Sequence, residues 1–282
     1  MNNSNRERIH HNGVTYIQPE SKILHRSPLA ASEIGARVCY DSFDKAETGI
    51  KYYTFEDLFL PEIEQSDLAE HLSHVYHHES IMEHTNVTFH LRNVGRGVLQ
   101  EVVRHRIAAY SVRSTRYTMS DLLITGLVHY RNGKDNVAYE EWLVQSDAFI
   151  LDGFMLKVEA RTVADKLFSY IDEVGILIST RLILSKDQIE AFDASSDLPV
   201  HKAISLITKE KNKRNVGDTF KFLISDMFST ELVVTMNMRA LKNFFSLRRS
   251  GAAYFLIRAL ADDMFDQLPD GYKRIIVKPK KD

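Results

Sequence analysis

The chain has 282 residues, of which 44% are hydrophobic and 26% charged, ordinary values for a soluble globular protein with a full hydrophobic core. Its 36 basic and 38 acidic side chains give a net charge of −2, so no global field draws it to nucleic acid or an anionic membrane. The single cysteine, Cys39, excludes an intrachain disulfide and a cysteine-rich metal site. Residues 1–11 are polar and no apolar run reaches the ~20 residues of a membrane span, so we expect a cytoplasmic protein.

The first half of the chain predicts short elements of both kinds. Helices are indicated by apolar residues that recur every three or four positions, and strands by strict alternation. The predicted elements are an N-terminal leader over 1–25 that ends in a short strand, a helix at 29–38, a loop at 44–61, a helix at 67–76, a half-buried strand at 85–91, a helix at 95–109 and an extended stretch at 110–117.

The second half predicts mostly helices. A long middle segment, about 122–216, is followed by a helical last third and a charged tail over 271–282. In the middle segment we expect helices at 147–170 and 174–191, a loop at 193–199 and a solvated basic run at 209–214. In the last third we expect helices at 218–234, 239–248 and 252–267. Without repeats or Ser/Gly linkers, the pattern predicts one α+β domain over 26–270, with helices around a modest sheet.

Basic residues gather near the end of the predicted helix at 95–109. Arg104, His105 and Arg106 are followed, after seven residues, by Ser114, and Arg116 comes two positions later. Residues two apart in an extended chain face the same way, so Ser114 and Arg116 can grip one phosphate with a hydroxyl and a guanidinium fork. Arg104 and Arg106 can meet a second anion, and His105 adds a titratable donor. On charge alone, a solvated helix end that favours the helix dipole is the preferred interpretation.

The spacing of this motif resembles the signature of the flavin-dependent thymidylate synthases: arginine-histidine-arginine, seven residues, serine. Two further blocks resemble the same family, His78-Glu79-Ser80 through His84 before a strand, and Asn237 through Arg248 in a helix. The resemblance covers about 28–117 and 218–260. It implies a mostly antiparallel sheet flanked by helices.

The resemblance also implies a role for residues of all three blocks. The implied FAD contacts are His78, Ser80, Glu83, Arg104, His105, Arg106, Ile107, Asn237, Arg239 and Asn243. The implied contacts with the nucleotide, deoxyuridine monophosphate (dUMP), are Glu101, Arg104, Ser114, Arg116, Lys221 and Arg248. Arg248, against the pyrimidine ring where it favours ionisation at N3, and His78, near the flavin, are the implied catalytic residues.

Several positions depart from the family's pattern. Glu101 stands where the family has a glutamine that helps to hold the nucleotide, and Val112 stands where it has a glutamate. Lys221 replaces an arginine, which keeps the charge and loses the bidentate fork. Ala252 begins a segment that lacks the family's histidine. The flavin contacts are therefore mostly retained, whereas the nucleotide and folate contacts are partly altered.

The implied activity is reductive methylation of dUMP to dTMP, a methyltransferase reaction in which NADPH reduces FAD and methylenetetrahydrofolate supplies the carbon. The resemblance implies a homotetramer. The departures leave open a variant that acts on another pyrimidine nucleotide such as dCMP, because Glu101 can accept from a cytosine amino group, or that transfers a different one-carbon group. A non-catalytic binder of nucleotides or nucleic acid is a third hypothesis, and the near-neutral charge argues against it.

Five histidines between positions 71 and 84 raise the question of a metal site. His74 and His78 are four apart, but the HExxH order is absent, so we expect no metal and place most of these histidines on a polar helix face. Cys39, between Val38 and Tyr40, is predicted to be a buried or inert thiol. Trp142 is predicted to pack in the core.

Overall fold

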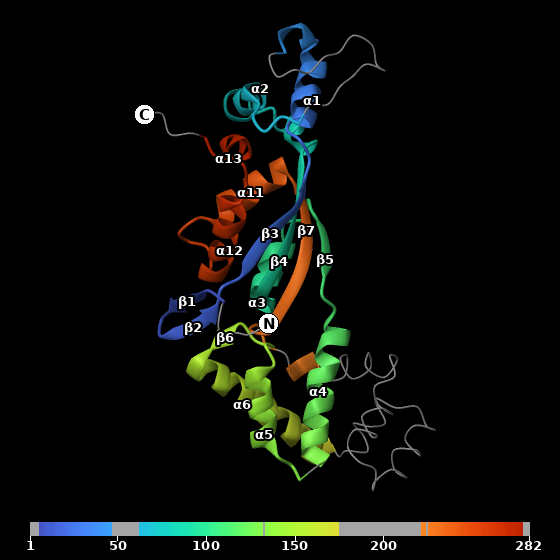
Figure 1. Ribbon diagram of the computed structural model, residues 1–282, viewed down its shortest axis with the longest axis vertical. Coiled ribbons are helices and arrows are strands. Elements are labelled where there is room, and N and C mark those ends of the chain that lie inside the picture. Colours follow the sequence, from blue (N-terminus) through green and yellow to red (C-terminus); the bar gives the residue numbers. More distant parts are fainter. Residues whose placement is uncertain (1–5, 47–61, 132, 175–220, 224, 279–282) are drawn as a thin grey trace, which may run out of the picture. The chain divides into compact units, whose positions relative to one another are not determined.

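The computed structural model describes residues 6–46, 62–131, 133–174, 221–223 and 225–278 (Figure 1). The predicted helix beyond Val174, the loop at 193–199, the basic run at 209–214 and most of the loop at 44–61 lie outside these residues. The chain divides into two compact units, here called the helical unit (residues 1–17 and 113–230) and the sheet unit (residues 18–112 and 231–282). The domain predicted over 26–270 takes residues from both units.

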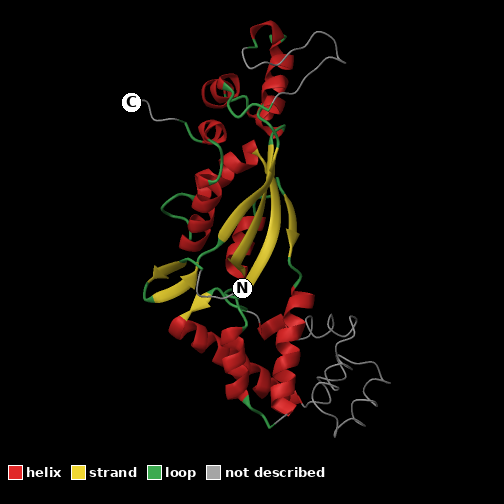
Figure 2. Cartoon of the chain, viewed as in Figure 1, coloured by secondary structure: helices red, strands yellow, loops and turns green. Residues whose placement is uncertain are grey.

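The sheet unit is built on four strands in the order β3-β4-β7-β5 (Figure 2). They are β3 (Glu20–Arg26), β4 (Asn86–Gly95), β7 (Ser229–Asn237) and β5 (Ala109–Val112). The pairs β3–β4 and β5–β7 are antiparallel. Alternate residues of β4 and β7 are buried, so one face of each strand packs inward.

The sheet unit also contains helices and helical turns. They are α1 (Ala30–Tyr40), the 3₁₀ turn η2 (Phe43–Lys45), α2 (Asp67–His71), the π-helical turn η3 (Leu72–Tyr76), the 3₁₀ turn η4 (Glu79–Glu83), α3 (Arg96–Val103), α11 (Met238–Arg248), α12 (Phe255–Asp266) and α13 (Asp270–Ile276). Helix α12 packs against β3, α3 and α11. Fully buried Phe89, Leu241 and Phe244 belong to the core of this unit.

The helical unit holds a three-stranded sheet and a helix cluster. The strands are β1 (Arg8–His11), β2 (Val14–Ile17) and β6 (Leu151–Asp152), in that order. The helices are α4 (Thr115–Arg131), α5 (Asn136–Gln145), α6 (Gly153–Val174) and the 3₁₀ turn η5 (Lys221–Leu223). Their core contains Tyr139 and Leu143, with Trp142 packed against it as predicted.

The helix pattern predicted from sequence is confirmed at 29–38, 67–76, 239–248 and 252–267, as is the strand at 85–91 and the α+β fold with an antiparallel sheet. The helix predicted at 218–234 is wrong, because η5 and β7 occupy that stretch. The expected leader over 1–25, with a single short strand, is replaced by three strands within residues 8–26. Cys39 is exposed, not buried. Among the described residues, no helix combines the length and the apolar character that crossing a bilayer requires.

Candidate functional site

The strand register of the sheet unit brings the three motif blocks to one region. Ala109, which follows the arginine-histidine-arginine motif, pairs with Thr235 near the end of β7. Thr88 of β4 donates to or accepts from Thr235 at 2.9 Å between the two hydroxyl oxygens. The backbone N–H of Met238 donates to the carbonyl oxygen of Thr85 at 2.9 Å. The start of α11 therefore lies beside both η4 and the motif.

Arg248, at the end of α11, is the centre of a group of polar side chains here called the Arg248 cluster: Glu101, Arg104, His105 and Arg248. Arg248 donates from Nε to His105 Nε2 at 3.0 Å, and its Nη1 lies 2.8 Å from Glu101 Oε2. Arg104 Nη1 lies 3.3 Å from the other carboxylate oxygen of Glu101. The arginine-histidine-arginine motif and the block from Asn237 to Arg248 are thus in direct contact, although Arg248 and His105 are 143 positions apart.

His105 is the buried member of this cluster, at 8% exposure. Its ring meets Phe244 of α11 edge to face, with 4.9 Å between centroids. Burial lowers the pKa of His105 and the charge of Arg248 lowers it further, while Glu101 opposes both. The neutral ring can accept from Arg248 at Nε2, which assigns the ring proton to Nδ1.

Tyr110 fixes the backbone of the motif. Its phenol donates to the carbonyl oxygens of Val102, at 2.9 Å, and of His105, at 2.6 Å. Burial raises the pKa of Tyr110 to about 12, so the phenol stays protonated and remains a donor. Sequence reasoning missed this residue, although it stands inside the motif's seven-residue spacer.

A second group of charges surrounds the start of α11. Arg239 lies 2.6 Å from Glu83 and 3.3 Å from Glu79, nitrogen to oxygen, and Lys242 lies 3.4 Å from Glu79. The side chain of Asn237 accepts from the backbone N–H of Ala240 at 2.8 Å and so caps the helix. Glu79 and Lys242 were not among the predicted site residues, and the spacing of Glu79 four positions before Glu83 was the signal available for the first of them.

His78 follows η3 and is exposed. Its Nδ1 shares a hydrogen bond with the Tyr40 phenol, and the two rings are parallel with centroids 5.9 Å apart. The centroid of the Tyr76 ring lies 6.1 Å from that of His78. Tyr40 is 38 positions from His78, so no local pattern in the sequence indicated it.

Four further predicted contacts, Ser80, Arg106, Ile107 and Asn243, are exposed residues of the sheet unit. Ser80 is in η4, Arg106 and Ile107 follow α3, and Asn243 shares the outer face of α11 with Arg239 four positions earlier. Within the described part of the chain, Arg106 makes no ion pair and the Asn243 amide no hydrogen bond. These polar groups are open to a ligand.

Ser114, Arg116 and Lys221 belong to the helical unit. The predicted extended stretch ends at Val112, and α4 begins at Thr115, so Arg116 is helical and Ser114 stands directly before the helix. The strand on which Ser114 and Arg116 were expected to share a face therefore ends before Ser114, and the contact of these two residues with a phosphate stays a prediction. Lys221 is exposed, in η5.

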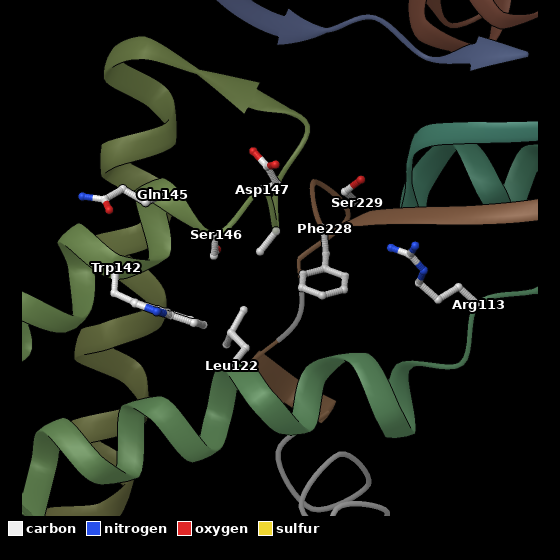
Figure 3. Close-up of a pocket in the computed structure, with 9 residues that line it drawn as sticks. Arg113, Leu122, Trp142, Gln145, Ser146, Asp147, Phe228 and Ser229 are labelled. Atoms are coloured by element: carbon white, nitrogen blue, oxygen red, sulfur yellow. The ribbon is translucent and has the colours of Figure 1, made fainter. Parts of the chain in front are cut away.

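The helical unit contains a cavity of about 430 Å³ that is lined by other residues than the charged groups described above. Figure 3 shows Leu122, Trp142 and Phe228 turned toward its interior, with Arg113 and Asp147 at its edges. None of the predicted site residues lines it. Among the described residues, no group of three or more metal-ligating His, Cys, Asp or Glu side chains gathers anywhere.

Comparisons with known proteins agree with the motifs. The family described as thymidylate synthase complementing protein matches residues 23–270. The flavin-dependent thymidylate synthase of Campylobacter jejuni (strain RM1221) is 28% identical over 253 residues, which are 90% of this chain and 93% of the relative. That of Helicobacter pylori (strain ATCC 700392 / 26695) is 25% identical over 245 residues, 87% and 91% of the two chains.

A solved structure has the same fold. The crystal structure of thymidylate synthase X from Helicobacter pylori with FAD and dUMP has a TM-score of 0.58 at 22% identity, over 91% of this chain and 97% of that one. At this identity the likeness concerns the fold alone. Since the family match spans most of the sequence, the chain belongs to the thymidylate synthase complementing protein family, that of the flavin-dependent thymidylate synthases.

Proposed function

We propose that this protein is a FAD-dependent thymidylate synthase that methylates dUMP to dTMP. The observation that carries the proposal is the contact of Arg248 with His105, 3.0 Å between Nε and Nε2, which joins two of the family's motifs in one cluster. A guanidinium held in this way can stabilise negative charge on a pyrimidine ring, and stabilisation of developing charge is a large term in catalysis.

The residues of the sheet unit fit FAD in kind. A dinucleotide cofactor carries a pyrophosphate, which needs cations, and a ring system that needs hydrogen-bond donors and acceptors. The exposed guanidinium of Arg106, the exposed Ser80 hydroxyl and the Asn243 amide meet those needs. Arg104 at 72% exposure is open to an anion as well. When bound, the flavin supplies the hydride, and the protein supplies position and charge.

By the family resemblance, Ser114, Arg116 and Lys221 would hold the nucleotide phosphate. Ser114 stands directly before α4, a helix of 17 residues, and the N–H groups of a helix N-terminus bind phosphate. Arg116 and Lys221 add two charges. This replaces the strand argument for Ser114 with one that uses the helix start.

Glu101 bears on the choice between dUMP and dCMP. Each of its carboxylate oxygens lies against an arginine, Arg104 on one side and Arg248 on the other. A carboxylate occupied in this way is a poor acceptor for the amino group of cytosine, so the contact favours dUMP.

The remaining parts of the proposal follow the family. NADPH would reduce the flavin, methylenetetrahydrofolate would supply the carbon, and the enzyme would work as a cytoplasmic homotetramer with no nucleic-acid or membrane partner. Val112 and Ala252 depart from the family's pattern, so the assignment of folate contacts rests on the family and not on side-chain contacts of this chain.

The test is spectroscopic and chemical. Purified protein should show flavin absorbance that NADPH bleaches, and it should convert dUMP to dTMP when methylenetetrahydrofolate is present. A parallel reaction with dCMP should give no methylated product. A colourless protein that binds no added FAD would contradict the proposal, and so would turnover of dCMP alone.

A further inference from the structure

Arg248 uses all three of its guanidinium nitrogens within the sheet unit. Nε donates to His105, Nη1 pairs with the Glu101 carboxylate, and Nη2 donates to the backbone carbonyl oxygen of Glu101 at 3.4 Å. A guanidinium carries five N–H groups, so two remain, one on each Nη atom. The side chain of Arg248 is 19% exposed, which fits a group that is held inside and presents one edge outward.

The position of Arg248 on its helix explains why it is held. Leu241 and Phe244, seven and four positions earlier, are buried residues of α11, and Arg248 continues their stripe at the helix end. A long side chain that continues a core-facing stripe brings its charge into a partly dry place, where a charge needs polar partners. Glu101, at the end of α3, supplies two of the three contacts.

We propose that Glu101 is a positioning residue for Arg248, which fixes the guanidinium so that its two remaining N–H groups face the pyrimidine as a fork. The proposal rests on the proposed function for the identity of the ligand. It adds that Glu101 acts through Arg248 and does not itself contact the nucleotide. Both carboxylate oxygens are already engaged, by Arg104 at 3.3 Å and by Arg248 at 2.8 Å, which leaves the fork of Arg248 as the group that reads the ring.

The consequence is a loss of orientation when Glu101 is removed. Without the carboxylate, Arg248 keeps the contact with His105 and the long 3.4 Å contact with the backbone carbonyl oxygen of Glu101, so the guanidinium is held less firmly. A small misplacement of a charged group at a reacting centre costs up to about 100-fold in rate. We therefore expect Glu101→Ala to lower kcat/KM for dUMP by about 10- to 100-fold. Glu101→Gln keeps one carbonyl acceptor for Arg248 and should recover part of this loss.

A double-mutant cycle with Arg248→Lys separates an indirect role from a direct one. A lysine amine cannot form the three contacts of the guanidinium. If Glu101 acts through Arg248, then Glu101→Ala changes kcat/KM by less than about twofold in the Arg248→Lys protein, because the two substitutions remove the same arrangement. Glu20→Ala is the matched control: Glu20 is 29% exposed against 31% for Glu101, and it pairs with Arg92 at 2.6 Å on β3 and β4. It should leave kcat/KM unchanged.

The same cycle in urea unfolding tests the contact without any assay of activity. The shift of the unfolding midpoint in the double variant should be smaller than the sum of the two single shifts. Equal losses of kcat/KM on both backgrounds, or additive midpoint shifts, would overturn the proposal. A wild-type protein that makes no dTMP and binds no dUMP would instead overturn the proposed function, and the unfolding cycle would still decide whether Glu101 holds Arg248.

Discussion

Removing the Tyr110 hydroxyl, as Tyr110→Phe, should loosen the motif backbone without changing any charge. The phenol donates to the carbonyl oxygens of Val102 and His105. Val102 keeps another partner, because its carbonyl also accepts from the backbone N–H of His105 at 3.2 Å. The net loss is therefore about one hydrogen bond, plus a carbonyl left without its phenol, or about 1–2 kcal/mol in the free energy of unfolding.

Thermal unfolding followed by circular dichroism measures this change. A loss of 1–2 kcal/mol corresponds to a fall of roughly 2–8 °C in Tm for a protein of this size class. FAD affinity should fall by up to about tenfold, the equivalent of 1.4 kcal/mol, since the backbone that carries Arg104 and Arg106 is less fixed. Tyr76→Phe is the control, because the exposed Tyr76 makes ring contacts but no hydrogen bond with the described residues. A Tyr110→Phe protein with the Tm of the wild type would refute the reasoning.

Three more predictions concern the sheet unit. Because the pKa of His105 is lowered in the folded state, the stability contributed by its neutral ring is full above about pH 6.5 and is lost as pH falls through the folded-state pKa. The urea midpoint plotted against pH between about pH 5 and 7.5 should therefore have a smaller slope in His105→Gln than in the wild type. An unchanged slope would contradict this. Gly271→Ala should lower the free energy of unfolding by about 1–3 kcal/mol, because a Cβ there would lie 1.9 Å from a backbone carbonyl oxygen. Gly251→Ala, where a Cβ would meet open space, should change the free energy of unfolding little in the same denaturation experiment. Arg239→Ala should weaken FAD binding by about tenfold in a fluorescence titration, while Arg92→Ala, equally exposed, should not; equal affinities would remove Arg239 from the FAD site.

The sequence predicted those features that depend on local periodicity or on a spaced motif. Helix α11 and strand β4 carry clear periods, and the Arg104–Ser114 spacing pointed to the family that the comparisons identify. The helix predicted at 218–234 failed because Leu232, Val234 and Met236 alternate over only a few residues, and a short apolar run of this kind fits either period.

The partners within the site were beyond such reasoning. The contacts Tyr40–His78, Glu79–Arg239 and His105–Arg248 join residues 38 or more positions apart, and the tertiary packing of helices and strands brings them together. The change from strand to helix at Thr115 had no apolar period to mark it. A motif fixes which residue types take part, whereas the register of the sheet fixes which of them touch.

The two faces of α11 explain why the flavin residues and Arg248 behave so differently. Arg239 and Asn243 lie four apart on the outer face, where Arg239 makes exposed ion pairs with Glu79 and Glu83 and the Asn243 amide faces solvent that a ligand can replace. Arg248 is nine positions from Arg239, about 900° around the helix and so on the opposite side. A charge there must be met by protein groups, and breaking such a partnership costs more than an exposed pair does. A hydrogen-bond acceptor at position 101 is therefore what the location of Arg248 requires, and the Glu101 carboxylate supplies it at 2.8 Å.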